Sequence, residues 1–257
     1  MNANATHVLA FDTSTERLAA GLQSPGGAPL TFEGGGGALA STTLLPRLRA
    51  LLERAGIGWN DLGAIAFGVG PGAFTGLRTA CSVAQGLGYG LGRPLHPIDS
   101  LLIVAEDARA QAGGDGDADF EVGVAMDARM DESYAGRYRW RDGRWQVVQA
   151  PALYDLDALA AAWSGAAPDA WAGSALAAFG DRLALAPAAR RLTQEADRAA
   201  ALLRLALGSA AAGAGIDAAA ALPLYLRDKV ALTTAERAAR AAAAGAAAAR
   251  PGPAVPP

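Results

Sequence analysis

Apolar residues along the chain recur with two periods, which predict strands and helices in a regular order. Short apolar runs that stop at glycine or at a polar residue predict buried strands, and leucines spaced three or four residues apart predict amphipathic helices. The first 112 residues give three strands, a helix, a strand, a helix, a strand and a helix. Their expected ranges are 7–12, 17–23, 30–33, 41–55, 62–69, 77–91, 94–98 and 100–112.

The second half of the chain begins in the same way as the first, after a glycine- and aspartate-rich linker at 113–117. An apolar run at 121–127 ends in aspartate, and strands at 133–140 and 144–148 flank an Asp-Gly turn. A helix, a short strand, a second helix and an extended segment are expected at 155–163, 170–172, 196–212 and 223–227.

The two halves share their order of elements. When Asp12 is aligned with Asp127 without gaps, each segment reads strand, aspartate, polar turn and returning strand. Duplicated lobes of this kind resemble the RNase H-like or actin-like (ASKHA) fold of sugar kinases and chaperone ATPases, in which two lobes face each other across a cleft. We therefore expect an α/β protein with two such lobes, each a mixed sheet covered by helices, at 1–112 and 113–230. Residues 231–257 are expected to form a flexible tail rich in alanine and proline.

Composition excludes several kinds of chemistry. The 257 residues carry a net charge of −3, which does not favour nucleic-acid binding through phosphate neutralisation. With two histidines (His7 and His96) and one cysteine (Cys81, expected in the core), the chain offers neither an HxxxH metal site nor an internal disulfide. The single lysine, Lys229, lies outside any phosphate-loop motif. No signal peptide or membrane span is predicted, and the expected compartment is a reducing cytoplasm.

One glycine-rich segment, Gly-Pro-Gly-Ala-Phe-Thr-Gly-Leu-Arg at 70–78, joins a predicted strand to a predicted helix. Glycine allows close approach of the backbone, and a threonine in this segment is placed to cap the helix. Two interpretations follow: a tight connection that binds nothing, or a loop whose backbone N–H groups bind an anion or a nucleotide beside the helix N-terminus. In the second case the contacting residues are Gly70, Gly72, Thr75, Gly76 and Arg78.

The same segment resembles the GPGSFTGLR signature of the bacterial TsaB (YeaZ-type) family. Other segments, in the right order along residues 7–230, resemble further landmarks of that family. They are Leu-Ala-Phe-Asp-Thr-Ser-Thr-Glu at 9–16, Leu-Leu-Pro at 44–46, Ala-Gln-Gly-Leu at 84–87, Asp-Ala-Arg-Met at 127–130 and Pro-Leu-Tyr-Leu-Arg at 223–227. The sequence departs from the family at Ala73, where serine is usual, and at Ala40, where many members carry histidine.

The resemblance implies a non-catalytic role in making threonylcarbamoyladenosine (t6A) in tRNA. TsaB-type proteins form a heterodimer with a TsaD-type transferase, a TsaE-type ATPase joins them, and the complex modifies N6 of adenosine 37 in tRNAs that read ANN codons. By this resemblance the chain has no catalytic residue, metal or cofactor of its own, and ATP or ADP would bind at the interface of the complex. It would contact tRNA only through the complex, would not bind membranes, and could form a homodimer when alone.

Two alternatives of a different class remain. A stand-alone small-molecule kinase or ATPase would share the expected fold, although the phosphate loops and a recognisable adenosine motif are missing from the sequence. A metalloprotease is the second alternative, and the spacing of metal ligands that it needs is not present.

The helix expected at 75–91 carries small residues at every fourth position, flanked by leucines. These residues are Gly76, Ala80, Ala84, Gly88, Leu77 and Leu91. Such a stripe lets another helix approach closely. That helix is either the chain's own helix at 41–55 or a helix of the partner, and the dimerisation of the family through its N-terminal lobe favours the partner.

In kinases and ATPases of the actin-like fold, carboxylates at the ends of the equivalent strands of the two lobes bind Mg²⁺. Here the turn that follows Asp12 consists of Thr13 and Ser14 and lacks the glycines that would cradle phosphate. In the second lobe, Arg129 places a bulky cation next to Asp127. We interpret these five residues as structural relics of a phosphate site.

Overall fold

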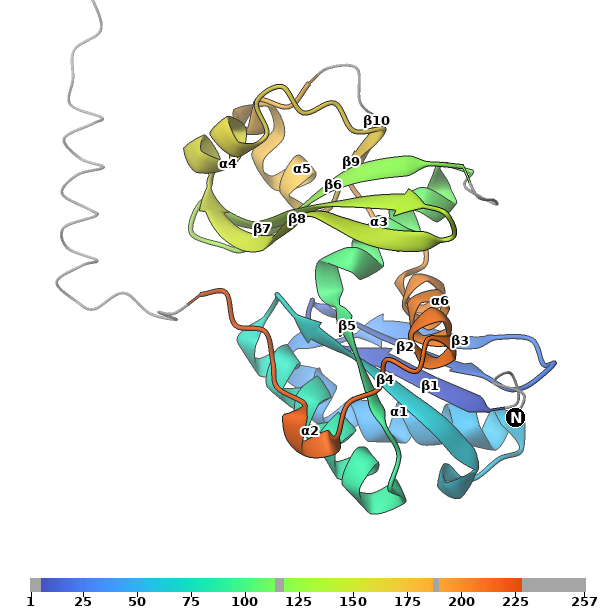
Figure 1. Cartoon of the computed structure of the whole chain (residues 1–257). Helices are drawn as coiled ribbons and strands as arrows, with labels where there is room; N and C mark the ends of the chain where they lie inside the picture. Colours follow the sequence, from blue (N-terminus) through green and yellow to red (C-terminus); the bar gives the residue numbers. More distant parts are fainter. Residues whose placement is uncertain (1–5, 114–117, 187–189, 228–257) are drawn as a thin grey trace, which may run out of the picture. The chain divides into compact units, whose positions relative to one another are not determined.

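The computed structural model describes residues 6–113, 118–186 and 190–227. This part of the chain contains two five-stranded mixed sheets with covering helices (Figure 1). The chain up to Leu226 is one compact unit that includes both sheets. Within the described residues, no helix is both long and apolar enough to cross a membrane. The tail expected at 231–257 lies outside the described residues.

The first sheet has the strand order β3-β2-β1-β4-β5. Its strands are β1 (His7–Asp12), β2 (Arg17–Gln23), β3 (Leu30–Gly35), β4 (Leu62–Gly70) and β5 (Leu95–Asp99). The first three pair antiparallel, whereas β4 runs parallel to β1 and β5 runs parallel to β4. Side chains alternate along β1, so that Leu9 and Phe11 point to one face of the sheet and Val8 and Ala10 to the other.

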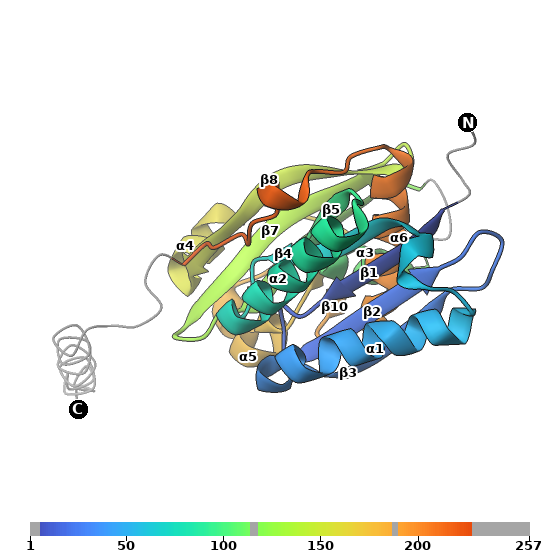
Figure 2. The same cartoon turned by 90° about the horizontal axis from the view of Figure 1, so that it is seen from below.

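Four helices cover these two faces (Figure 2). They are α1 (Ala40–Ala55), α2 (Phe74–Leu91), α3 (Ser100–Gln111) and α6 (Arg198–Ala211). The first two pack on the face of Leu9 and Phe11, and the last two pack on the opposite face. Helix α1 ends at Ala55, as predicted, and its C-cap residue Gly56 has a left-handed backbone (φ 68°).

The second sheet repeats this topology with the order β10-β9-β6-β7-β8. Its strands are β6 (Phe120–Asp127), β7 (Glu132–Arg141), β8 (Arg144–Asp155), β9 (Ala170–Ala172) and β10 (Arg190–Leu192). Two short helices, α4 (Leu156–Ala162) and α5 (Ala175–Phe179), pack on one face. Again a three-stranded antiparallel meander is extended by two parallel strands beside its first strand. The prediction of two lobes of the RNase H-like, actin-like type is confirmed.

Helix α3 lies between the two sheets (Figure 1). Its Ile103 belongs to the core of the first sheet, whereas Leu101, Val104 and Ala108 pack with Val122 of the second. One helix therefore contributes to two hydrophobic cores. Short 3-10 turns complete the described structure at Gly37–Leu39, Trp59–Asp61, Gly180–Leu183 and Ala218–Ala220.

The element boundaries differ from the expected ones in a few places. Strand β8 continues to Asp155 instead of ending at 148, because β7 pairs with it beyond an irregularity near Arg137. Helix α6 follows the second sheet in sequence but packs on β1 and β2 of the first. The first lobe is thus completed by residues from the end of the described chain, and the expected boundary at 112/113 stays a prediction.

Candidate functional site

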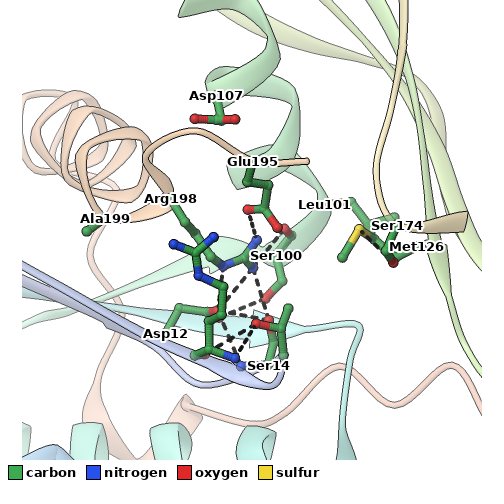
Figure 3. A network of polar contacts seen from close by, with 12 residues as sticks. Asp12, Ser14, Ser100, Leu101, Asp107, Met126, Ser174, Glu195, Arg198 and Ala199 are labelled. Carbon is green, nitrogen blue, oxygen red and sulfur yellow. Dashed lines mark hydrogen bonds and ion pairs between the residues drawn. The ribbon is translucent and has the colours of Figure 1, made fainter. Parts of the chain in front are cut away.

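A buried network of charged and hydroxyl side chains lies at the edge of the first sheet where β1 and β4 end. Asp12 is the last residue of β1, Ser100 is the first residue of α3 and Arg198 is the first residue of α6. These residues come from distant parts of the sequence, and their side chains meet in one buried network (Figure 3). This network contains Asp12, one of the two aspartates that the sequence analysis named.

Asp12 is a fully buried carboxylate, and both of its oxygens accept hydrogen bonds from the protein. Its Oδ1 accepts a hydrogen bond from Ser100 Oγ at 3.1 Å. Its Oδ2 accepts from the backbone N–H and the hydroxyl of Ser14, at 3.3 and 2.9 Å, and from Arg198 Nε at 3.1 Å. A carboxylate held in this way has no oxygen directed at an external ligand.

Arg198 supplies the positive charge of the network, and its side chain is 1% exposed. Nη1 donates to Glu195 Oε2 at 2.5 Å, and Nη2 donates to Ser14 Oγ at 3.1 Å and to the carbonyl oxygen of Ser100 at 3.4 Å. Burial by itself lowers the pKa of this guanidinium, but the carboxylates of Glu195 and Asp12 raise it more, so the pKa lies above its usual value. The group is a permanent cation.

The glycines of the 70–78 segment pack against the turn that follows β1. A Cβ on Gly72 would lie 2.3 Å from the carbonyl oxygen of Ser14, and one on Gly76 would lie 1.8 Å from that of Thr13. The N–H of Ala73 donates to the Ser14 carbonyl at 2.7 Å, and Thr13 Oγ1 donates to the Gly76 carbonyl at 2.7 Å. Carbonyl oxygens repel anions, so this geometry favours the tight connection over the predicted anion or nucleotide contact.

Thr75 and Arg78, the two side chains expected at that anion site, are both exposed. Helix α2 begins at Phe74, and its N-cap residue is Ala73, which makes no side-chain cap hydrogen bond. The predicted capping role of Thr75 is therefore wrong, because Thr75 lies inside the first turn. The Arg78 guanidinium lies 3.8 Å from the centre of the Phe74 ring, and its Nε donates to the hydroxyl of Tyr225 at 3.1 Å.

The small-residue stripe of α2 is buried inside the chain's own core, so the partner contact predicted for it needs correction. Ala80 and Ala84 are 0% exposed, and a Cβ on Gly88 would lie 3.0 Å from both Ala218 and Leu95. Leu77 is buried and Leu91 half-buried. The alternative, that the stripe faces the protein itself, agrees with this packing. Helix α2 packs on β4 and on the 3-10 turn at Ala218–Ala220. The sequence analysis had named only the helix at 41–55 as a neighbour within the chain.

A strap at residues 216–225 runs along α2 and holds this arrangement. Cys81 Sγ and Gln85 Nε2 both donate to the carbonyl oxygen of Ala221, at 3.1 and 2.9 Å. The N–H of Leu224 donates to the carbonyl oxygen of Val69 at 2.7 Å. Burial raises the pKa of the Cys81 thiol. Cys81 is therefore a buried packing residue, as expected.

Asp127 of the second lobe lies in a different environment from Asp12. Its Oδ1 accepts from the N–H of Arg129 at 2.8 Å, and the Arg129 guanidinium lies 3.8 Å from both Asp127 and Glu16. Arg129 and the two residues that follow it have positive φ (66°, 61° and 59°). The structure thus brings Asp12, Thr13 and Ser14 together with the glycine-rich segment, but it does not add Asp127 or Arg129 to the buried network.

An open groove with a volume of about 790 Å³ lies between α1 and α2. Leu45, Trp59 and Leu87 provide apolar walls, and Arg49 and Glu53 provide the polar rim. Leu45 is 46% exposed although it lies on a packed helix. Leu91, one of the two leucines predicted for the partner contact, also lines this groove, whereas no such role was predicted for Leu45 or Trp59.

A family model described as TsaD, tRNA N6-adenosine threonylcarbamoyltransferase, matches residues 39–249. The solved structure of YeaZ from Pseudomonas aeruginosa is 37% identical, with a TM-score of 0.75, and the match covers 86% of this chain and 100% of that one. The chain belongs to the TsaB (YeaZ) family. The resemblance given by the sequence motifs is confirmed.

Curated relatives in the TsaB family are named tRNA threonylcarbamoyladenosine biosynthesis proteins. The TsaB protein of Haemophilus influenzae is 39% identical over 131 residues, which are 49% of this chain and 51% of that protein. The TsaB protein of Escherichia coli K12 is 32% identical over 151 residues, 57% of this chain and 61% of that protein. The match thus spans about half the length of these relatives.

Arg198 belongs to the buried network of this TsaB-family chain but was not among the predicted site residues. It lies 186 residues from Asp12 and belongs to an alanine-rich helix whose pattern reports only an apolar face. The one local signal was an arginine at the first position of a helix, where the helix dipole does not favour a cation. Such a position indicates that a carboxylate is close by.

Proposed function

We propose that this chain is a non-catalytic partner subunit of a TsaD-type transferase, and that the complex threonylcarbamoylates N6 of adenosine 37 in ANN-decoding tRNAs. Membership of the TsaB family supports the pathway. The non-catalytic part of the proposal is supported by Asp12, because both of its carboxylate oxygens accept hydrogen bonds from the protein itself.

The groove between α1 and α2 is the observation that carries the partner role. Leu45 on α1, Leu87 on α2 and Trp59 on the 3-10 turn after α1 line this open groove with apolar area. Tyr89 on α2 is 64% exposed. Exposed apolar surface of this kind marks a protein interface. We therefore move the proposed interface from the buried stripe to the outer faces of α1 and α2, where an apolar helix pair of the partner would fit.

The other members of the complex follow from this proposal. A TsaE-type ATPase would join the heterodimer, ATP or ADP would bind at its interface, and tRNA would be contacted through the complex. When the partner is absent, a second copy of the chain could cover the same groove. The cytoplasm is the compartment in which these partners and tRNA meet.

The test is co-elution with the TsaD-type protein of the same organism, followed by reconstituted tRNA modification. Leu45→Arg and Leu87→Arg put a charge into the groove, and each should weaken co-elution at least tenfold while circular dichroism stays unchanged. Val147→Arg is the matched control, since Val147 is 60% exposed on β8. Its binding and activity should equal those of the unmodified chain.

Two results would contradict the proposal. One is full binding and activity in both groove variants. The other is turnover by the isolated chain with Mg-ATP and a small-molecule substrate, which would favour the kinase or ATPase alternative. If binding fails only in Val147→Arg, the interface lies on the second sheet.

A further inference from the structure

We propose that the cluster around Asp12 is a cation site whose resident cation is the chain's own Arg198, and that this guanidinium closes the site to any other cation. Kinases and ATPases of this fold use a carboxylate at the end of the first strand for Mg²⁺ and phosphate. The residues present here do not fit that group, because a buried guanidinium already contacts the carboxylate. Arg198 therefore occupies the position that a free cation would need.

The ligands of the guanidinium are all oxygen atoms. They are Asp12 Oδ2, Ser14 Oγ, Glu195 Oε2 and the carbonyl oxygen of Ser100, at 2.5 to 3.4 Å from its nitrogens. Hard divalent cations and guanidinium both favour such oxygen ligands. Two carboxylates face one guanidinium, so the cluster has one negative charge more than its resident cation can balance. The ligand set explains why a cation is required but leaves open which one.

The protein holds the carboxylate in place from the opposite side. A Cβ on Gly68 would lie 1.7 Å from Asp12 Oδ1, so the carboxylate lies directly against the backbone of β4. Ser100 Oγ, which donates to that oxygen, accepts in turn from the N–H of Gly70 at 3.1 Å. These contacts do not involve Arg198, so they remain when its side chain is removed.

Tethering explains why Arg198 occupies the site in place of a free ion. Asp107 on α3 accepts hydrogen bonds from the N–H groups of Ala196 and Asp197, at 3.0 and 2.9 Å. The side chain of Asp197 then caps α6 by accepting from the N–H of Ala200 at 2.9 Å. The backbone on either side of the arginine is fixed, so its guanidinium is bound at a high effective concentration and a free cation cannot compete.

Arg198→Ala tests the proposal in the isolated full-length chain, independently of the partner role. The substitution leaves an oxygen-lined hole that a small cation can fill, so millimolar methylguanidinium should raise the melting temperature by about 3 °C or more, the shift expected at about ten times the dissociation constant. Mn²⁺ should also stabilise this variant and should compete with methylguanidinium. Neither ligand should shift the unmodified chain by more than about 1 °C.

Two further variants serve as controls. Arg204→Ala removes an arginine from the same helix, but its side chain is 41% exposed, so no closed hole results and methylguanidinium should have no effect. Asp12→Asn combined with Arg198→Ala removes the carboxylate as well, and its response to both ligands should be lost. Mn²⁺ bound elsewhere on the surface would still stabilise this double variant.

Arg198→Gln covers the case in which Arg198→Ala does not fold, because its amide keeps one donor for Asp12 while the charge is gone. If both variants are insoluble, the same ligands are tested during refolding, where methylguanidinium should increase the soluble yield severalfold. The proposal is overturned if neither ligand stabilises or rescues either variant. It is also overturned if the unmodified chain binds Mn²⁺ in a manner that Asp12→Asn abolishes.

Discussion

The hydroxyl of Tyr138 donates a hydrogen bond of 2.6 Å to Asp99 Oδ2, which joins the second sheet to the first. Tyr138 is 0% exposed on β7, and Asp99 ends β5 and caps α3 by accepting from the N–H of Leu101. Burial raises the pKa of Asp99, while the hydrogen bonds from Tyr138 and the backbone act in the opposite direction. The contact therefore stabilises the ionised carboxylate at the junction of the lobes.

Tyr138→Phe should destabilise the fold, and more so at neutral than at acid pH. The pKa of Asp99 is already raised above 3.8 in the folded state, so the cost of ionising it grows as the pH rises through its folded pKa. Loss of the hydroxyl removes a donor to that charge. Urea unfolding should show a loss of about 1–3 kcal/mol at pH 7 and a smaller loss at pH 4. An equal loss at both pH values would contradict this account.

Glu106→Gln should show the same direction of pH dependence for a different reason. Burial acts to raise the pKa of Glu106, but hydrogen bonds from Arg109 and Arg204 outweigh it, so the pKa is lowered from 4.5. The carboxylate thus contributes stability above about pH 4.5 that disappears as the pH falls through its folded pKa.

The expected loss for Glu106→Gln is about 2–4 kcal/mol at pH 7, because two guanidinium groups lose their buried counter-charge. The hydrogen bond from Trp145 Nε1 to Glu106, at 3.0 Å, should survive, since the amide oxygen can accept it. The difference between variant and parent should shrink below pH 4. Chemical unfolding at three pH values measures it, and Glu53→Gln on the exposed side of α1 is the control.

Two glycines on α2 should respond in opposite ways to alanine. At Gly76 the added Cβ would meet the Thr13 carbonyl at 1.8 Å, so Gly76→Ala must shift the turn after β1 and should cost several kcal/mol. At Gly86 nothing lies within 4 Å, and Gly86→Ala should stabilise the helix by about 0.5–1 kcal/mol. Thermal unfolding of both variants and of the unmodified chain measures these two changes in stability. A neutral Gly76→Ala would mean that the glycine-rich segment is not fixed against Thr13.

His96 should make the fold sensitive to mild acid. Burial lowers the pKa of this imidazole, whose Nδ1 lies 3.0 Å from Ser209 Oγ. Below about pH 6.5 the unfolded chain therefore binds a proton that the folded chain does not, and stability falls by up to about 1.4 kcal/mol per pH unit. His96→Gln should flatten the stability curve between pH 7.5 and 5.5. A curve with unchanged slope would show that another group is responsible.

Most strands and helices of both sheets were predicted, because local patterns specify them. Strand β10 and helix α5 were not predicted, since three and five residues are too few to show a period. The apolar run that ends at Asp12 and the glycine that stops α1 act within a few residues. The buried site was not predictable in the same way. Arg198 meets Asp12 across 186 residues, and no periodicity reports a contact at that distance.

The stripe of α2 shows why a pattern alone does not indicate which surface covers it. Small residues at every fourth position permit close approach by any neighbour, and the neighbour here includes the chain's own strap near Ala218. The exposed leucines of the groove carry no distinct signal either, because Leu45 follows the buried Leu44 directly. Burial depends on the packing of the whole chain.

Helix α6 is the last long helix of the described chain, and it completes the N-terminal lobe. This lobe is therefore the first to be synthesised and the last to be completed. Val8 and Ala10 emerge first, yet the face of β1 that bears them is covered by Leu202 and Ala206. The second sheet, by contrast, packs on α3, which is made before it. A nascent chain therefore completes its C-terminal lobe first, and its N-terminal sheet stays open on one side until α6 has been translated.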